Sequence, residues 1–277
     1  MATFTNKATL SYNGRTTESN TVTGTITETL SVTKNALMGS YTAGSEVVYV
    51  VSLINAGATP VNDLTVTDDL GGYSFGTETV YPLDYVEGSA AYYVGGVLQP
   101  APTVTGSAPL VLSGINIPAN SSAILLYAAS VNENAPLDIG ATIVNTVTVG
   151  DLSASAIVSV ANEASLTISK ALSPATVVEN GTLTYTFVIQ NTGNTPVVAT
   201  DNAVVTDVFD PILTITSVTL NGTPLTLGTG YTYDETTGTF TTTEGTITVP
   251  AATFTQQPDG SYVTTPGEAT LVVTGTI

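Results

Sequence analysis

Residues that could form an amide cross-link recur at matching positions along this chain of 277 residues. Lys34 ends one run of alternating apolar residues, and Asp68 ends another. Asn145 interrupts the apolar stripe of a third run, residues 141 to 149. Because alternate side chains of a β-strand share one face, all three polar side chains are expected on core-facing positions of one domain.

Two interpretations of this set stay open. In the first, Lys34 and Asp68 form a buried ion pair and Asn145 completes a hydrogen-bonded network, which a sheet core tolerates when every group is satisfied. In the second, burial favours a neutral amine and a protonated carboxyl group. Lys34 then attacks the Asn145 carboxamide with Asp68 as proton relay, so ammonia leaves and an isopeptide bond remains.

A second set repeats the first. Lys170 and Asp207 occupy the same places in a later copy of the sequence, but the corresponding asparagine is Asn6, near the start of the chain. We expect Lys170 to attack Asn6 of a neighbouring subunit, with Asp207 as the relay. The alternation turns Asp69 away from the core and places Lys7 on a threonine face, so neither is expected to take part.

An internal repeat underlies these matches. Residues 30 to 60 align without a gap onto residues 166 to 196. Every aligned pair is 136 residues apart, as for Lys34 and Lys170 (170 minus 34). After a short insertion LTVTD (64 to 68) matches AVVTD (203 to 207), and SAILLYAASV (122 to 131) matches EATLVVTGTI (268 to 277). Agreement at a fixed separation indicates duplication of a domain.

The two copies are out of phase with the chain. The first continues into the strand ATIVNTVTV (141 to 149), whereas the second stops before any such strand. A similar stretch, ATFTNKATL (2 to 10), lies at the start of the sequence. It is followed by a turn at Asn13-Gly14 and by a second stretch (17 to 28) that leads into the first domain. The expected donor strand presents one apolar stripe, formed by Ala2, Phe4, Asn6, Ala8 and Leu10.

A domain that lacks a strand exposes a sheet edge and an apolar slot, which a strand of another molecule can fill. The opening segment would have to fold back past the whole first domain to reach its own second domain. Translation along an axis is the simpler geometry, so we expect an open, head-to-tail homopolymer.

Composition indicates an all-β protein of two tandem immunoglobulin-like β-sandwiches. Short alternating runs are separated by Asn-Gly, Pro and Gly signals, and no segment has a helical period. The expected organisation is a donor strand or hairpin with its connector at residues 1 to 28, a sandwich at 29 to 150, and a sandwich lacking its last strand at 151 to 277.

The acidic composition of the chain argues against two classes of partner. The net charge of -18 argues against nucleic acid and anionic membranes, and no apolar run is long enough to insert in a membrane. The chain contains no cysteine and no histidine, so we expect no enzyme acting on an external substrate and no cofactor. Calcium at Asp68-Asp69 or at Asp201, Asp207 and Asp210 is the weaker alternative.

One motif recurs in both copies, with Tyr49, Asn55, Gly57 and Asp68 in the first and Tyr185, Asn191, Gly193 and Asp207 in the second. It resembles a repeat of bacterial and archaeal surface proteins, the domain of unknown function eleven. The resemblance implies an extracellular immunoglobulin-like sandwich without catalytic activity, here in an arrangement similar to donor-strand pilins. We therefore expect a subunit of an extracellular or spore-surface filament, with a monomeric adhesin or glycan-binding module as the alternative.

Overall fold

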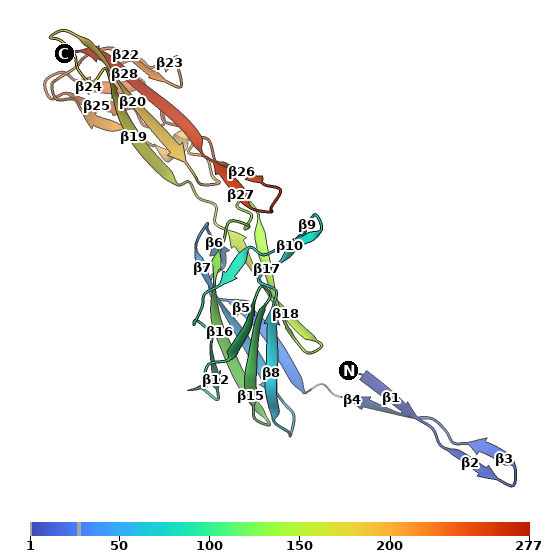
Figure 1. Cartoon of the computed structure of the whole chain (residues 1–277). Coiled ribbons are helices and arrows are strands. Elements are labelled where there is room, and N and C mark those ends of the chain that lie inside the picture. Colours follow the sequence, from blue (N-terminus) through green and yellow to red (C-terminus); the bar gives the residue numbers. More distant parts are fainter. Residues whose placement is uncertain (1, 27–28) are drawn as a thin grey trace.

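The structure is a computed structural model that describes residues 2–26 and 29–277. Within these residues the protein is all-β, and its single helical turn is η1 (Ala199–Asp201). Figure 1 shows two β-sandwiches, domain 1 and domain 2, arranged end to end, with a separate N-terminal hairpin beside domain 1. The predicted fold class is confirmed.

The described residues of the N-terminal segment form a hairpin, and the expected donor residues lie on its first arm. β1 (Ala2–Asn6) pairs with β4 (Val22–Ile26), and β2 (Thr9–Tyr12) pairs with β3 (Arg15–Glu18). Lys7 and Ala8 separate β1 from β2, whereas three residues separate β3 from β4, so the ladder is interrupted there. The predicted turn at Asn13-Gly14 is confirmed, because both residues have positive φ angles, 48° and 74°.

Domain 1 consists of two six-stranded sheets that enclose one apolar core. The first sheet is formed by β5 (Leu30–Ala36), β7 (Glu46–Asn55), β16 (Ser121–Val131), β12 (Ala91–Val94), β13 (Val97–Leu98) and β11 (Leu83–Tyr85). The second is formed by β14 (Thr103–Ser107), β15 (Leu110–Ile117), β8 (Val61–Asp68), β17 (Thr142–Val149), β18 (Leu152–Val160) and β6 (Ser40–Tyr41). A small hairpin, β9 (Tyr73–Phe75) with β10 (Glu78–Val80), stands outside these sheets.

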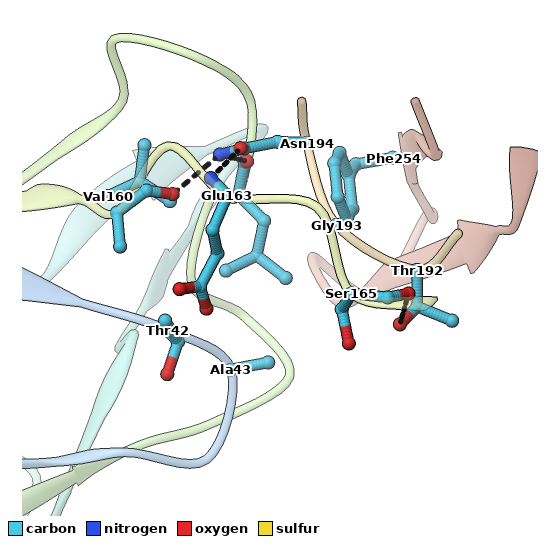
Figure 2. A pocket seen from close by; sticks show the side chains of 11 residues that line it. Thr42, Ala43, Val160, Glu163, Ser165, Thr192, Gly193, Asn194 and Phe254 are labelled. Carbon is cyan, nitrogen blue, oxygen red and sulfur yellow. Dashed lines mark hydrogen bonds between the residues drawn. The ribbon is translucent and has the colours of Figure 1, made fainter. Parts of the chain in front are cut away.

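The boundary between the domains lies later than we expected. β18 pairs along its whole length with β17, so residues 152 to 160 belong to domain 1 and the boundary falls within 161–165 instead of between 150 and 151. The sequence cue misled us because Gly150-Asp151 is the turn of a hairpin inside the domain. Figure 2 shows the seam, where the Asn194 side chain of domain 2 accepts from the Glu163 amide and donates to the Ala161 carbonyl.

Domain 2 repeats the first sheet but has a smaller second sheet. The first contains β19 (Leu166–Ser173), β20 (Thr182–Asn191), β28 (Gly267–Thr276), β22 (Thr214–Leu220) and β23 (Thr223–Pro224). The second contains only β21 (Thr206–Val208), β25 (Thr239–Thr242) and β24 (Tyr231–Asp234). A hairpin of β26 (Thr253–Gln256) and β27 (Tyr262–Thr265) extends from this domain toward domain 1 (Figure 1).

The strand registers confirm the duplication. Lys34 lies opposite Val51 in one sheet, and Lys170 lies opposite Phe187 in the other, at the positions that the alignment pairs. The asparagine of the Asn-x-Gly motif, Asn55 or Asn191, joins two loops through its side-chain hydrogen bonds. Asn55 Nδ2 donates to Thr59 and Pro118 at 2.8 and 3.0 Å, and Asn191 Nδ2 donates to Thr195 and Pro250 at the same distances.

The two domains differ in what covers their opening strand. In domain 1 the β17–β18 hairpin packs across β5, whose residues alternate between exposed and partly or fully buried. Within the described residues, domain 2 has no counterpart of this hairpin, and all eight residues of β19 are exposed. One inner surface of domain 2 is therefore left open.

Replacing Asn55 or Asn191 by alanine tests these side-chain hydrogen bonds. Each change leaves two carbonyls and the amide of Gly57 or Gly193 without their side-chain partner, so we expect a loss of about 2–4 kcal/mol in unfolding free energy. Urea unfolding followed by circular dichroism measures it. The exposed Asn116→Ala is the control, and equal effects from all three substitutions would contradict the assignment.

Candidate assembly and cross-link site

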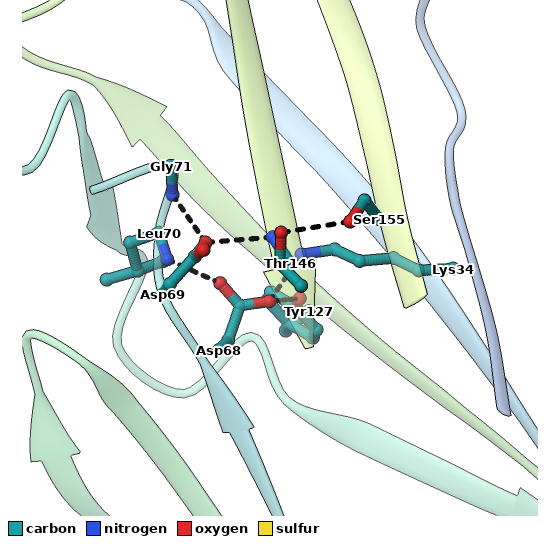
Figure 3. Close-up of polar contacts among 8 residues, drawn as sticks. All are labelled: Lys34, Asp68, Asp69, Leu70, Gly71, Tyr127, Thr146 and Ser155. Carbon is teal, nitrogen blue, oxygen red and sulfur yellow. Dashed lines mark hydrogen bonds and ion pairs between the residues drawn. The ribbon is translucent and has the colours of Figure 1, made fainter. Parts of the chain in front are cut away.

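A buried polar cluster lies between the two sheets of domain 1. Lys34 Nζ is 2.5 Å from Asp68 Oδ2, and both side chains are fully buried. The Tyr127 hydroxyl donates to the same carboxylate oxygen, while the Leu70 amide donates to Oδ1 at 2.8 Å. Figure 3 shows Lys34 and Tyr127 converging on Asp68. The aspartate therefore lies between an amine and a phenol, both of which can exchange a proton with it.

The environment of Lys34 favours a neutral amine. Burial lowers the pKa of Lys34 from its ordinary 10.5 to about 8, although the neighbouring Asp68 acts in the opposite direction. The amine also lies over the Tyr49 ring, 4.5 Å from its centroid. Because an unprotonated amine is the nucleophilic form, the lowered pKa gives Lys34 a larger reactive fraction near neutral pH than an exposed lysine has.

Asn145 is also fully buried, and neither its Nδ2 nor its Oδ1 has a hydrogen-bond partner among the described residues. Its carboxamide lies beside the Tyr49 hydroxyl. Burial raises the pKa of Tyr49 above its ordinary value, although the Asn145 neighbour acts in the opposite direction. Tyr49 thus has the Lys34 amine over its ring and the Asn145 carboxamide beside its hydroxyl. An unsatisfied amide in a core costs about 1–3 kcal/mol, so this position requires an explanation.

The strand that carries Asn145 is fixed in place by backbone contacts. Asp68 lies opposite Val147 in the β8–β17 ladder, and the Thr146 amide donates to Asp69 Oδ1 at 2.8 Å. Asp69 Oδ1 also accepts from the Gly71 amide at 3.0 Å, so this carboxylate links the β17 strand to the turn that follows β8. Thr146 also bonds Ser155 on β18 at 2.9 Å (Figure 3). The hairpin is therefore held on both sides of Asn145.

Domain 2 has the lysine and the aspartate of this cluster in an open setting. Lys170 forms an ion pair with Asp207, but its side chain is 41% exposed, against 0% for Lys34. Its amine lies over the Tyr185 ring, 4.5 Å from the centroid, as Lys34 lies over Tyr49. The described part of domain 2 supplies no asparagine at the position of Asn145. Apolar neighbours on the same face of β19 are exposed as well, namely Leu166, Ile168 and Leu172.

Two side chains of the closed cluster have no equivalent in domain 2. Val273 lies opposite Tyr185 where Tyr127 lies opposite Tyr49, so no phenol reaches Asp207. Val208 follows Asp207 where Asp69 follows Asp68. The domain 2 cluster therefore has fewer polar contacts of its own than the domain 1 cluster.

The N-terminal hairpin carries the residues that we expected to form the donor stripe. Phe4 and Leu10 are 55% and 65% exposed, and Asn6 and Ala8 are exposed too. The Ala2 side chain lies outside the described features, although its backbone pairs with Ile26. Across the hairpin the Phe4 ring lies over Gly24, where a Cβ atom would come within 2.4 Å of it. The corresponding pair in domain 1 is Ile143 with Val158, so a large and a small residue replace two medium ones.

Tyr127 and Gly24 are the residues that sequence reasoning missed. Tyr127 lies on an alternating strand rich in apolar residues, so period alone gives no reason to separate its hydroxyl from the core. Gly24 is identified only once the register of β1 with β4 is known. The repeat offered one signal, because Tyr127 and Val273 differ at aligned positions.

The acidic residues considered as calcium ligands do not gather into a metal-sized group in the described part of the chain. No group of three or more acidic side chains gathers there to hold a metal ion. Asp68 is already engaged by Lys34, Tyr127 and Leu70. No helix in the described residues is long and apolar enough to cross a membrane.

No protein-family model and no curated protein sequence matches this chain, so the resemblance to the surface-protein repeat stays a prediction. Among solved structures, the chain is similar to the pilus backbone RrgB of Streptococcus pneumoniae, with 14% identity, coverage of 90% of this chain and 50% of that chain, and a TM-score of 0.34. It is similar to BcpA, the major pilin subunit of Bacillus cereus, with 13% identity, coverage of 96% and 73%, and a TM-score of 0.34. The type II cohesin dyad from the ScaA scaffoldin of Acetivibrio cellulolyticus gives 10% identity, coverage of 88% and 85%, and a TM-score of 0.28. TM-scores this low carry no argument about assembly.

The lysines should differ in reactivity toward an amine-directed acylating reagent. In unassembled protein we expect rapid modification of Lys7 and Lys170, whose side chains are 43% and 41% exposed, and protection of the fully buried Lys34. Peptide mass spectrometry after timed labelling measures the rates. Equal rates at Lys34 and Lys170 would show that the two clusters are not closed and open forms of one site.

Proposed function

We propose that this protein is the structural subunit of an extracellular filament, assembled head to tail from identical copies. The N-terminal hairpin of one subunit inserts into domain 2 of the next and takes the place that β17–β18 takes in domain 1. The inserted unit is a hairpin, so it supplies both a strand beside β21 and a cover for β19. Neither nucleic acid nor a membrane takes part in this assembly.

The exposure of β19 is the observation that carries the proposal. Ile168 is 57% exposed, whereas its counterpart Val32 is partly buried and packs against the domain 1 core. The apolar stripe of the N-terminal hairpin is exposed as well. Joining the two surfaces removes both from water, at about 25 cal/mol for each Å² of apolar surface buried.

The edges of the opening also match a hairpin. In domain 1, β17 pairs with β8 and β18 pairs in parallel with β6 at Ser40 and Tyr41. The aligned residues of domain 2 are β21 on one side and Thr176 with Val177 on the other, which lie outside any strand. An inserted hairpin therefore meets backbone partners on both sides.

We further propose that the domain 1 cluster condenses into an isopeptide bond. Lys34 Nζ attacks Cγ of Asn145, the Nζ–Cγ bond forms, and the Cγ–Nδ2 bond breaks. Asp68 first takes a proton from the Lys34 ammonium, which leaves a neutral amine and a neutral carboxyl group. The carboxyl group gives this proton to Nδ2, which leaves as ammonia, and takes another from the attacking amine, so Asp68 ends uncharged. The reaction removes a buried ion pair and an unsatisfied carboxamide together, which supports it on energetic grounds.

The same chemistry at the junction would make the filament covalent. Insertion of the hairpin brings Asn6 to the position of Asn145, beside Lys170 and Asp207 of the neighbouring subunit. It also buries Lys170, and burial is what lowers the pKa of Lys34. Lys170 is therefore expected to attack Asn6 only after the hairpin has entered.

Two matched substitutions on the hairpin test assembly. Phe4→Glu places a charge on the stripe that enters the neighbour, so we expect it to abolish polymers, because an unpaired buried charge is strongly destabilising. Thr5→Glu places the same charge one residue away on the opposite face and should leave polymers intact. Light scattering and electron microscopy measure the outcome.

Complementary variants give the decisive control. A chain with Phe4→Glu can only accept a hairpin, and a chain with Ile168→Glu can only donate one, so their mixture should form dimers that neither forms alone. Polymers formed by the Phe4→Glu chain alone would refute the insertion mechanism. A second domain found closed in the monomer would do the same.

The isopeptide bond in domain 1 has a mass and a pH signature. The intact chain should lose the mass of one ammonia for this bond, and Asn145→Ala should not. In Asn145→Ala the free amine has a folded pKa of about 8 against an ordinary 10.5. The unfolded chain then binds more protons between these values, so the unfolding free energy rises with pH across this window, by at most about 3 kcal/mol.

Below pH 8 the amine is protonated in both states, so this gain is absent there. The native chain, whose Lys34 nitrogen is an amide, should lack the rise, and so should the double variant Lys34→Met with Asn145→Ala. Urea unfolding at several pH values measures it. An unshifted mass in the native chain would reject the bond and leave the ion-pair interpretation.

A further inference from the structure

The interface between the two domains is built by segments that occur in one domain and have no equivalent in the other. We call the β26–β27 hairpin the clasp. In domain 2 it lies between Pro250 and β28, whereas domain 1 passes from Pro118 into β16 at Ser121 without any such hairpin. Pro118 and Pro250 are equivalent, because each accepts the hydrogen bond of Asn55 or Asn191. The clasp is therefore an addition to domain 2.

The surface under the clasp is an addition to domain 1. Gln256 Nε2 donates to the Tyr73 hydroxyl at 2.9 Å, and Gly260 packs so closely on Val80 that a Cβ atom would lie 2.6 Å from its side chain. Tyr73 and Val80 belong to the β9–β10 hairpin, between β8 and β11. Domain 2 runs from β21 into β22 without one. The Tyr262 amide adds a bond of 2.7 Å to the Glu133 carbonyl.

The connecting segment is fastened by a third feature found only in domain 2. Asn194 Nδ2 donates to the carbonyls of Leu137 and Ala161 at 3.0 and 2.9 Å, and its Oδ1 accepts from the Glu163 amide at 3.1 Å. Figure 2 shows Asn194 directed at the connecting segment. Its aligned residue in domain 1 is Ala58, which has no group to make these bonds.

From these three differences we infer that the filament has two kinds of joint. The joint inside each subunit is fixed by the clasp, the β9–β10 hairpin and Asn194. The joint between subunits, which rests on the proposed function, brings domain 1 after a domain 2 and therefore lacks all three. Each subunit is then a stiff rod of two domains, and the filament bends at the junctions between subunits.

Distances between spin labels test the joint inside the subunit without any need for polymers. The chain has no cysteine, so Glu87→Cys and Glu235→Cys place one label on an exposed loop of each domain. In the full chain with Phe4→Glu, pulsed electron resonance should give one narrow distance distribution. Adding Tyr73→Ala and Gln256→Ala should broaden it several-fold, and an already broad distribution with the clasp intact would overturn the fixed joint.

The same two sites measure the joint between subunits. Chains with only Glu87→Cys and chains with only Glu235→Cys are labelled, mixed and polymerised, so that the nearest label pairs span a junction. We expect a distribution clearly broader than that of the doubly labelled monomer. An equally narrow one would overturn the inference although polymers form, whereas failure to polymerise would count against the proposed function and leave the monomer result standing.

Discussion

A β-sandwich is stable when each sheet covers the inner face of the other, and in this protein the cover for the first strand comes from the last hairpin. β5 opens domain 1, and β17–β18 closes over it only after more than a hundred residues have been placed. Lys34 makes this closure essential, because an amine on an inner face needs a partner and a cover at once. The same requirement applies to Lys170, but the hairpin that resembles its cover stands at the other end of the chain.

The comparison of the two clusters shows which interactions belong to the fold and which belong to closure. The lysine over the tyrosine ring and its ion pair with aspartate are present in both domains. Burial of the amine, which lowers its pKa, accompanies the hairpin in domain 1. The scaffold thus places the amine and the acid in advance, and the hairpin brings the asparagine and removes water.

Much of this arrangement could be predicted from alternation and repetition. The period of two placed Lys34, Asp68 and Asn145 on inner faces, because strand geometry leaves no other choice once the strands are recognised. The fixed separation of the copies identified Lys170 and Asp207. What alternation cannot give is pairing between strands, so the register of β1 with β4 was not predicted and the domain boundary was set at a turn. Tyr127 was missed for a related reason, since its bond to Asp68 crosses between sheets.

The place of the lysine and the asparagine along the chain has a mechanical consequence. Lys34 lies on the first strand of domain 1 and Asn145 on its second-to-last, and the strands run roughly along the long axis of the molecule (Figure 1). With an amide bond between them, tension entering at Leu30 would pass directly to β17 and leave through Val160. The residues between 35 and 144 would carry none of it. Such a domain would keep residues 35 to 144 folded under load, because only the short segments on either side of the bond would carry the force.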